Sequence, residues 1–198
     1  MKPVTSDGRS ARWDDHRRRR RRELLRTIRH VIDEHGADLS MDEISARSGT
    51  TKTVLYRYFG DRGGLQACMG DWAMDVIRRS LAEAPAPAGD RRAALAGMID
   101  AFTALAAGSP AVYRFCDSAL ARSAGAPARG FLADVTDLLC VRMGLTGDSE
   151  ILWADGAIGF VRSCTERWLH DPTDRADFTD RLTTWLWDSS RSFMEVYR

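Results

Sequence analysis

Hydroxyl, phenol and cationic side chains gather in one short segment directly after Gly49. They are Thr50, Thr51, Lys52, Thr53, Tyr56 and Arg57. Hydroxyl and phenol groups exchange hydrogen bonds with base edges, while Lys and Arg bind phosphate oxygens. If the segment is helical, these side chains share an outward face, which favours hydrogen bonding to a nucleic acid. A charged helix that only faces solvent is the alternative interpretation.

Two short helices would position this segment. Ser40 stands three residues before Glu43, a capping box that predicts a helix from Met41 to about Arg47. A tight turn over 48–51, permitted by Gly49, leads into a second helix over 52–59. Their small shared core is predicted from Ile44, Ala46 and Leu55. This arrangement is a helix-turn-helix, whose second helix reads the major groove.

Six consecutive arginines, 17–22, run into an amphipathic helix that stops at Gly36. One interpretation is a solvated, frayed helix start. The other is an arm that lies along a phosphate backbone or enters a minor groove. The neighbouring helix-turn-helix favours this second interpretation. Because positive charge at a helix N-terminus opposes the helix dipole, we expect this arm to order only when phosphates neutralise it.

The stretch from Gly49 to Leu65, GTTKTVLYRYFGDRGGL, resembles the signature of TetR-family regulators. In that family a glycine turn precedes a short recognition helix with Leu-Tyr, an aromatic pair ending in Phe, and a basic residue that opens the next helix. The preceding DEISARSG and the leading helix match as well, so the resemblance covers about residues 17–70. Three features depart from the pattern: Arg62 replaces the usual Lys, Tyr58 a frequent His, and Gly63-Gly64 an acidic pair, which predicts a looser start for that helix.

The residue types and the resemblance together predict a set of DNA-contacting residues. They are Arg17, Arg18, Arg19, Arg20, Arg21, Arg22, Ser40, Met41, Thr50, Thr51, Lys52, Thr53, Tyr56, Arg57, Tyr58 and Arg62. Within this set Thr51, Lys52 and Thr53 would reach bases or phosphates, and Arg62 would hold a phosphate bidentately. For Tyr58, inward packing is an alternative that the sequence leaves open.

Composition agrees with a soluble globular protein that contacts a polyanion at one end. Hydrophobic residues make up 44% of the 198 and charged residues 29%. Residues 1–80 hold 17 Lys and Arg against 12 Asp and Glu, whereas residues 81–198 hold 12 against 16. The sequence has no apolar run of about 20 residues and no apolar signal-peptide core, so we expect a cytoplasmic protein. The four cysteines are widely spaced, which predicts buried thiols and no metal or cofactor.

The remaining sequence predicts more helices and no strand pattern. After a helix beginning near Asp61 and a Pro/Ala linker at 84–89, the clearest boundary in the chain, helices are expected near 90–107, 110–122, 127–143, 148–170 and 174–197. We therefore predict an all-α fold of about nine helices, with an N-terminal three-helix helix-turn-helix domain and a C-terminal helical ligand-binding and dimerisation domain. The expected divisions are a disordered arm at 1–16, a DNA-binding domain at 17–62, and an effector-binding and dimerisation domain at 63–198.

The last two long helices carry apolar residues on more than one face, which a monomer cannot bury completely. The TetR resemblance implies that these helices pair with their copies, so we predict a homodimer and a palindromic operator. The residues expected at the dimer interface are Ala154, Ile158, Val161, Arg162, Thr165, Leu182, Leu186 and Ser190.

In TetR-like proteins the middle helices enclose an effector pocket. The candidate lining residues are Trp72, Phe102, Leu105, Tyr113, Cys116, Asp117, Leu120, Phe131, Asp155 and Phe160. Each alone is explained more simply by core packing, but together they suit a mostly apolar pocket, with Asp117 and Asp155 as polar contacts. Such a pocket predicts a hydrophobic or aromatic ligand.

The leading hypothesis is a repressor that leaves its palindromic operator when a small, mostly hydrophobic ligand binds; repression itself rests on family habit. Its partners would be double-stranded DNA, a second copy of the chain and the effector, with no membrane. One alternative is a non-specific basic DNA-binding protein. Another is an all-helical enzyme, but the sequence has no Gly-rich phosphate loop, HExxH, GxSxG or paired-carboxylate cluster, so we expect no enzymatic activity.

Overall fold

The computed structural model describes residues 7–122 and 131–194. Within these ranges it does not describe the side chains of 7–12, 14, 118–122 and 192–194. The described residues form the helices α1 (Asp7–His35), α2 (Met41–Ser48), α3 (Lys52–Phe59), α4 (Arg62–Glu83), α5 (Arg91–Gly108), α6 (Pro110–Arg122), α7 (Phe131–Met143), α8 (Asp148–Trp168) and α9 (Arg175–Met194). No strand occurs among them, so the predicted all-α class is confirmed.

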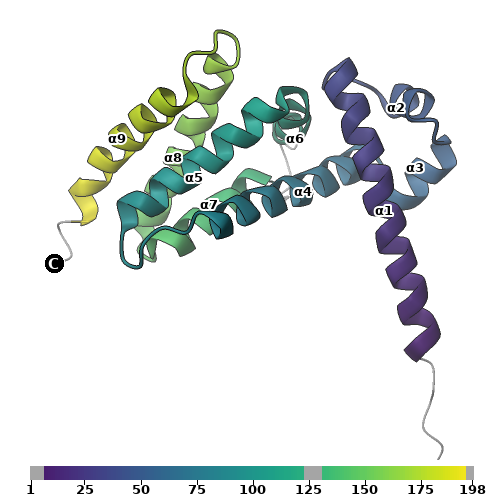
Figure 1. The fold of residues 1–198 in the computed structure, drawn as a ribbon, viewed down its shortest axis with the longest axis horizontal. Coiled ribbons are helices and arrows are strands. Elements are labelled where there is room, and N and C mark those ends of the chain that lie inside the picture. The colour runs from purple at the N-terminus through teal and green to yellow at the C-terminus, as the bar shows by residue number, and fades with distance from the viewer. Residues whose placement is uncertain (1–6, 123–130, 195–198) are drawn as a thin grey trace, which may run out of the picture.

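Helices α1–α3 form a small unit at one end of the molecule, and α4 leads from it into a bundle of α5–α9 (Figure 1). The buried side chains make one continuous cluster that extends from Leu24 in α1 to Leu186 in α9. The Pro/Ala segment at 84–89 joins α4 to α5, and these two helices pack against each other. That segment is therefore a turn within the bundle. The buried residues of α4 belong to the same core as those of α1–α3 and of α5–α9, so α4 connects the small unit to the bundle.

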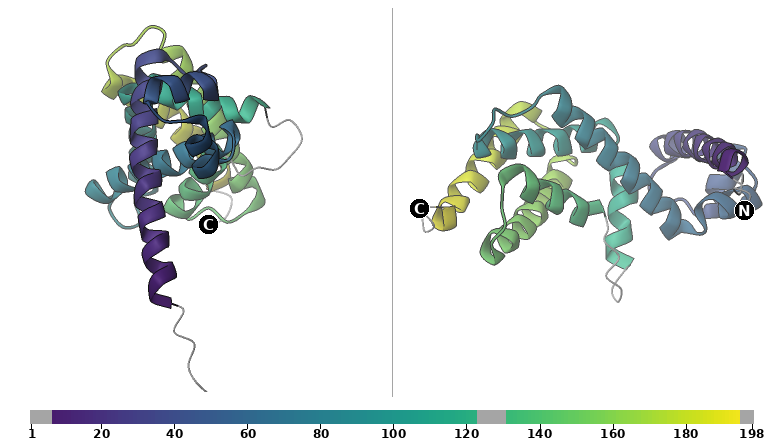
Figure 2. Two further views of the ribbon diagram at one scale, coloured as in Figure 1. Left: turned by 90° about the vertical axis from the view of Figure 1, so that its right-hand side faces the viewer. Right: turned by 90° about the horizontal axis from the view of Figure 1, so that it is seen from below.

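The N-terminal half of α1 extends away from the other helices (Figure 2). Because α1 begins at Asp7, residues 7–16, which we expected to be disordered, are helical, and residues 1–6 lie outside the description. Ion pairs one turn apart, Asp15 with Arg18 and Arg20 with Glu23, offset part of the charge repulsion along this helix. The arginine segment is thus part of one continuous helix.

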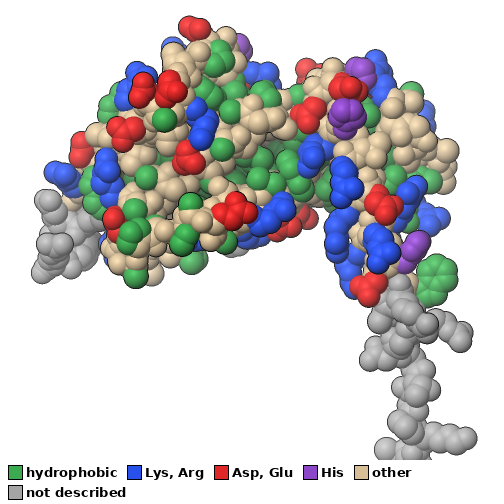
Figure 3. All heavy atoms as spheres, viewed as in Figure 1, with side chains coloured by type: hydrophobic (Ala, Val, Ile, Leu, Met, Phe, Trp, Pro, Cys, Tyr) green, Lys and Arg blue, Asp and Glu red, His purple; other side chains and the backbone are tan. Residues whose placement is uncertain are grey.

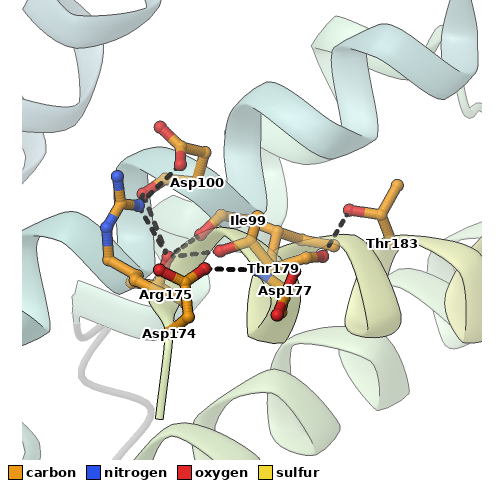
Figure 4. A network of polar contacts seen from close by, with 8 residues as sticks. Ile99, Asp100, Asp174, Arg175, Asp177, Thr179 and Thr183 are labelled. Carbon is orange, nitrogen blue, oxygen red and sulfur yellow. Dashed lines mark hydrogen bonds and ion pairs between the residues drawn. The ribbon is translucent and has the colours of Figure 1, made fainter. Parts of the chain in front are cut away.

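Helix α9 is fixed on α5 by a network of threonines and one ion pair (Figure 4). Arg175 Nη1 lies 2.6 Å from Asp100 Oδ1, and the hydroxyls of Thr103 and Thr179 are 3.2 Å apart. Thr183 donates to the Thr179 carbonyl oxygen at 2.8 Å. All three threonines are buried, so these hydrogen bonds remove the cost of unpaired hydroxyls in the core.

No single helix among the described residues is long and apolar enough to cross a membrane. Helix α5 and the start of α6 reach that length and composition only together, as a pair bent by 109°. Half of the α5 side chains are buried inside the bundle, where they pack against α4, α7 and α9.

Candidate DNA interface

Helix α2 begins at the predicted capping box. The Ser40 backbone N–H donates to Glu43 Oε2 at 2.8 Å, and the Glu43 N–H donates to Ser40 Oγ at 3.2 Å. These donors stabilise the carboxylate, so they hold the pKa of Glu43 below its ordinary value. Ile44 is buried in the shared core as predicted, whereas Ala46 is exposed on the opposite side of this short helix.

The turn between α2 and α3 depends on a glycine and two side-chain hydrogen bonds. Gly49 has φ +64°, a left-handed conformation that costs a residue with a β-carbon about 1 kcal/mol or more. Ser45 Oγ donates to the Thr50 carbonyl oxygen at 2.6 Å, and Thr51 Oγ1 accepts from the Val54 N–H at 3.4 Å. The turn and the N-cap together fix the direction in which α3 leaves α2.

Helix α3 has a buried face and an outward polar face. Leu55 and Phe59 are buried in the shared core. The exposed side chains are Thr51, Lys52, Thr53, Tyr56 and Arg57. Tyr58 is half-buried, with the Arg57 guanidinium 5.5 Å from its ring centroid, so the inward alternative applies to this residue. Thr50 is half-buried in the turn, and the polar face that remains is compact and open to solvent.

One of the two cations on this face, Lys52, forms a weak ion pair. Lys52 Nζ lies 2.6 Å from Asp42 Oδ2 of α2, and both side chains are more than half exposed. A surface ion pair of this kind contributes only about 0–1 kcal/mol. A phosphate oxygen can therefore compete with Asp42 for the Lys52 ammonium.

The arginine segment of α1 faces two directions. Trp13, Arg17 and Arg20 continue, at spacings of three and four residues, the buried stripe that begins at Leu24. They therefore project on the same side of α1 as the buried stripe, and Trp13 lies about 16 Å beyond Leu24 along the helix axis. Figure 3 shows Lys and Arg side chains gathered along this part of α1.

Arg21 and Arg22 lie instead toward α4. The Arg21 guanidinium donates to Cys68 Sγ at 2.6 Å, and Arg22 lines a cleft between the two helices. The predicted arm therefore contains arginines that meet α4, namely Arg21 and Arg22, and arginines that continue the line of the buried stripe, namely Arg17 and Arg20.

Residues 24–67 match the family model described as bacterial regulatory proteins, tetR family. HTH-type transcriptional regulators of Mycobacterium tuberculosis strains CDC 1551 and H37Rv are each 31% identical over 206 residues, spanning 98% of this chain and 86% of the relative. The chain belongs to the TetR family. It is a DNA-binding transcriptional regulator, as the sequence predicted.

Solved TetR-family structures share the fold. A TetR transcriptional regulator from Rhodococcus sp. RHA1 superposes with a TM-score of 0.66 at 14% identity, covering 87% of this chain and 95% of that one. A tetR-family regulator from Streptomyces coelicolor gives a TM-score of 0.62 at 20% identity, covering 87% and 85%. These likenesses confirm the predicted all-α architecture.

Two residues of this TetR-family chain that we assigned to DNA contact point inward. Met41 is buried in the shared core. The Arg62 guanidinium donates to the carbonyl oxygens of Leu39 and Ala37, the latter at 2.8 Å, and lies 4.8 Å from the Phe115 ring centroid. The predicted phosphate contact of Arg62 is wrong because its donors already serve the α1–α2 turn. Those partners are more than 20 residues away, so no local pattern could reveal them.

The double glycine at the start of α4 also has a structural role. Asp61 caps the helix by accepting from the Gly64 N–H at 2.8 Å. A β-carbon at Gly64 would lie 1.9 Å from the Phe59 carbonyl oxygen. The α3–α4 turn is therefore tight and capped, and the looser start that we expected is absent.

The predicted pocket residues divide into a buried group and an outer group. The buried ones are Phe102, Leu105, Tyr113, Cys116 and Phe131. The Phe102 ring contacts the Tyr113 ring edge-on at 5.6 Å and stacks on the Phe131 ring at 6.3 Å. Asp117 binds Arg162 of α8 through two contacts of 2.6 Å. The apolar space between α5, α7 and α8 measures only about 10 Å³, so this interior is closed.

Three other predicted pocket residues lie elsewhere. Asp155 and Phe160 are exposed on α8, so their assignment to the interior is wrong; they occupy the helix face turned away from the bundle. Trp72 is half-buried on α4, with the Arg29 guanidinium of α1 4.3 Å from its ring centroid. Leu120 falls outside the described side chains.

Seven of the eight predicted dimer residues are buried inside the protomer, so their assignment to the interface is wrong. The buried ones are Ala154, Ile158, Val161, Thr165, Leu182, Leu186 and Ser190. Arg162 is held by Asp117 of its own chain. The opposite face of the α8–α9 pair exposes Leu152 (73%), Phe160 (39%) and Trp185 (55%). Apolar periodicity identified the helices, but contacts with α5 and α7 decide which face is buried.

Proposed function

We propose that the chain is a repressor that binds a palindromic operator as a homodimer and leaves it when a small, mostly hydrophobic effector binds. The observation that carries this proposal is the presence of two solvent-exposed surfaces of different character. One is the polar face of α3, and the other is the apolar stripe on α8 and α9. In this role the chain acts by binding alone.

The outward face of α3 suits major-groove reading. Thr51, Thr53 and Tyr56 offer hydroxyls for base edges or phosphates, and Lys52 and Arg57 offer cations. Lys52 would exchange Asp42 for DNA on binding. Because base contacts specify and phosphate contacts position, loss of the Tyr56 hydroxyl should reduce sequence preference more than total affinity.

The extension of α1 would add phosphate contacts beside the recognition helix. Arg17 and Arg20 continue the buried stripe of α1 beyond the part of α1 that packs on α2, so we expect a duplex lying against α3 to come within their reach. Each phosphate they neutralise releases counterions, which makes this part of the affinity strongly dependent on salt.

The DNA-binding proposal is tested by fluorescence anisotropy with a duplex from the upstream region of the protein's own coding sequence, against a scrambled duplex. Lys52→Ala and Tyr56→Phe should each weaken specific binding by about 1–3 kcal/mol. Arg17→Ala with Arg20→Ala should weaken both duplexes and lower the salt slope by about 2. Arg142→Ala, an exposed cation on α7, is the matched control. Equal affinity for both duplexes at moderate salt would refute specific operator binding.

The exposed apolar stripe supports a homodimer. Phe160 and Trp185 contact each other across α8 and α9 with ring centroids 6.2 Å apart, and Leu152 lies two turns away on α8. A β-carbon added at exposed Gly156 or Gly159 would meet nothing within 4 Å, so a partner helix can approach closely there. Two-fold pairing through this face would place two α3 helices on one duplex, which requires a palindromic operator.

The dimer proposal is tested by light scattering after size exclusion. Leu152→Asp should convert the dimer to a monomer because it buries an unpaired charge at the interface. Val141→Asp, at a 79% exposed position on α7, is the matched control and should remain dimeric. A monomeric wild type, or equal behaviour of both variants, would contradict this interface.

An effector would enter near the junction of α6 and α8. The hydroxyls of Tyr113 and Thr165 are buried and have no hydrogen-bond partner among the described residues, which costs about 1–3 kcal/mol each. They lie one turn from Asp117 and Arg162, respectively. A ligand that opened this closed interior and supplied a hydrogen-bonding group would remove that cost. Displacement of α6 would then reach the DNA-binding unit through Phe115, which contacts Arg62.

Uncharged aromatic alcohols, from phenol to 2-naphthol, are suitable probes of this interior. A member that fits should raise the melting temperature and lower operator affinity, and Tyr113→Phe should weaken its binding by about threefold to tenfold. No change in melting temperature with any member of the series would count against an effector of this class.

A further inference from the structure

Helix α1 crosses α4 at the end of the bundle (Figure 1). An open cleft lies at this corner (Figure 3). Its volume is about 820 Å³, and its walls carry six arginines against two aspartates. Both helices contribute: Arg22, Arg26 and Arg29 from α1, and Arg78 and Arg79 from α4. Such an excess of guanidinium groups around one concave space suits a ligand with several negative charges.

The arginines of α1 have hydrogen-bond donors to spare. Arg22, Arg26 and Arg29 recur at spacings of four and three residues, so they share one face of the helix. Among the described residues, none of the three has a carboxylate within ion-pair distance. On α4, Arg78 lies 3.7 Å from Asp75, and both side chains are largely exposed. A phosphate or carboxylate ligand would therefore meet guanidinium groups whose planar donor pairs match its oxygens.

The floor of the cleft combines an aromatic ring, a guanidinium plane and apolar side chains. Trp72 is half-buried on α4, and the Arg29 guanidinium lies 4.3 Å from its ring centroid. Leu25 and Ala82 line the cleft beside it. A planar ring can pack on this floor while its charged groups meet the arginines, as aromatic side chains and guanidinium planes commonly stack on ring systems.

Operator DNA is a poor occupant for this cleft. The face with Arg22, Arg26 and Arg29 points away from the buried stripe of α1, at about 100° per residue around the helix. The stripe continues into Arg17 and Arg20. A stiff duplex seated on α3 can follow Arg17 and Arg20 but would have to turn around α1 to enter the cleft.

We propose that the α1–α4 cleft binds a small polyanion that carries a planar ring. The ligand would bridge α1, which belongs to the DNA-binding unit, and the part of α4 that belongs to the bundle. Binding there would be linked to the relative position of the two units, so ligand and DNA affinities would change by the same factor. The site is separate from the interior proposed for a hydrophobic effector and does not depend on it.

The test is calorimetry on the full chain without DNA, at about 150 mM salt so that diffuse attraction is screened. ATP serves as a polyanion with a ring, tripolyphosphate as the charge alone, and adenosine as the ring alone. ATP should bind at one site per chain, tripolyphosphate about tenfold more weakly, and adenosine without detectable heat. Arg26→Ala and Arg78→Ala should each weaken ATP binding about fivefold or more, while Arg142→Ala on α7 leaves it unchanged.

Trp72→Leu separates the ring from the charge. This substitution should lower the affinity for ATP to that for tripolyphosphate, and it should leave the affinity for tripolyphosphate unchanged. Absence of ATP binding, or equal losses in the Arg26, Arg78 and Arg142 variants, would overturn the proposal. So would equal losses of ATP and scrambled-duplex affinity in Arg26→Ala and Arg78→Ala, because the cleft would then be a DNA surface. Since this titration contains no operator, its failure leaves the operator measurements unaffected.

Discussion

The DNA-binding unit, formed by α1–α3, and the α8–α9 pair start from similar signals but differ in what determines their functional faces. Each contains a helix whose third residue is a glutamate that accepts backbone N–H groups: Glu43 in α2 and Glu150 in α8. In the DNA-binding unit, caps and a glycine turn fix which side of α3 points outward. In α8 and α9, apolar side chains occur on both faces, and packing against α5 and α7 chooses between them. Local signals therefore identify functional faces only where one face is polar.

The largest effect is expected from a substitution in the core beneath the polar face of α3. Leu55 has no exposed surface, so Leu55→Ala should lower the free energy of unfolding by about 2–5 kcal/mol and abolish DNA binding. Leu152→Ala, at a 73% exposed leucine, should leave the unfolding free energy of the monomer within about 0.5 kcal/mol. Leu152→Ala should instead weaken the self-association of the chain. Urea unfolding and sedimentation equilibrium measure the two quantities.

Equal destabilisation by the two leucine variants would contradict the contrast between a buried and an exposed apolar face. A Leu152→Ala protein that associates as tightly as wild type would also do so, because it would place the interface elsewhere.

A second comparison concerns two cations that sequence reasoning placed on the same surface. Arg62→Met removes donors to the carbonyl oxygens of Ala37 and Leu39, so it should lower stability by about 1.5–3 kcal/mol. Lys52→Met removes only an exposed ion pair and should change stability by less than about 1 kcal/mol. DNA affinity should fall in Lys52→Met even at temperatures where both variants are folded. If Arg62→Met were as stable as wild type, its inward role would be wrong.

These cases show why the sequence predicted some of the interface and not the rest. Ser40, Gly49 and Asp61 act on residues within three or four positions, so their roles were readable from spacing. Arg62 binds carbonyl oxygens of residues more than 20 positions away in the sequence. Phe160 and Val161 are neighbouring apolar residues of α8, but Val161 is buried and Phe160 is exposed because only one side of α8 packs against the bundle. Tertiary packing decides both. The overall helix order was predictable because Gly, Pro and apolar periodicity mark each boundary locally.

The two helix starts offer a smaller and sharper comparison. Ser40 adds a hydroxyl that caps the Glu43 N–H, whereas Gly147 at the equivalent place before α8 has none. Ser40→Ala should destabilise by about 1 kcal/mol. Gly147 has extended backbone angles and room for a β-carbon, so Gly147→Ser should stabilise by about 0.5 kcal/mol. Urea midpoints test both, and a destabilised Gly147→Ser variant would show that α8 needs glycine there.

The smallest effect is a pH dependence that distinguishes the two glutamates. Hydrogen bonds from neighbouring donors lower the pKa of Glu43 and of Glu150 from the ordinary value of 4.5. A lowered folded-state pKa means that the unfolded chain binds more protons, so this stability is present above pH 4.5 and is lost as pH falls. Wild type should therefore exceed Glu43→Gln and Glu150→Gln in urea midpoint near neutral pH, and the differences should close on acidification. Only Glu43 accepts from a side-chain hydroxyl, at 2.7 Å, so Ser40→Ala should weaken the Glu43 dependence and leave that of Glu150 intact. A difference for Glu43→Gln that stays constant from neutral pH to pH values below 4.5 would mean that the charge of this capping box does not contribute to the stability of the DNA-binding unit.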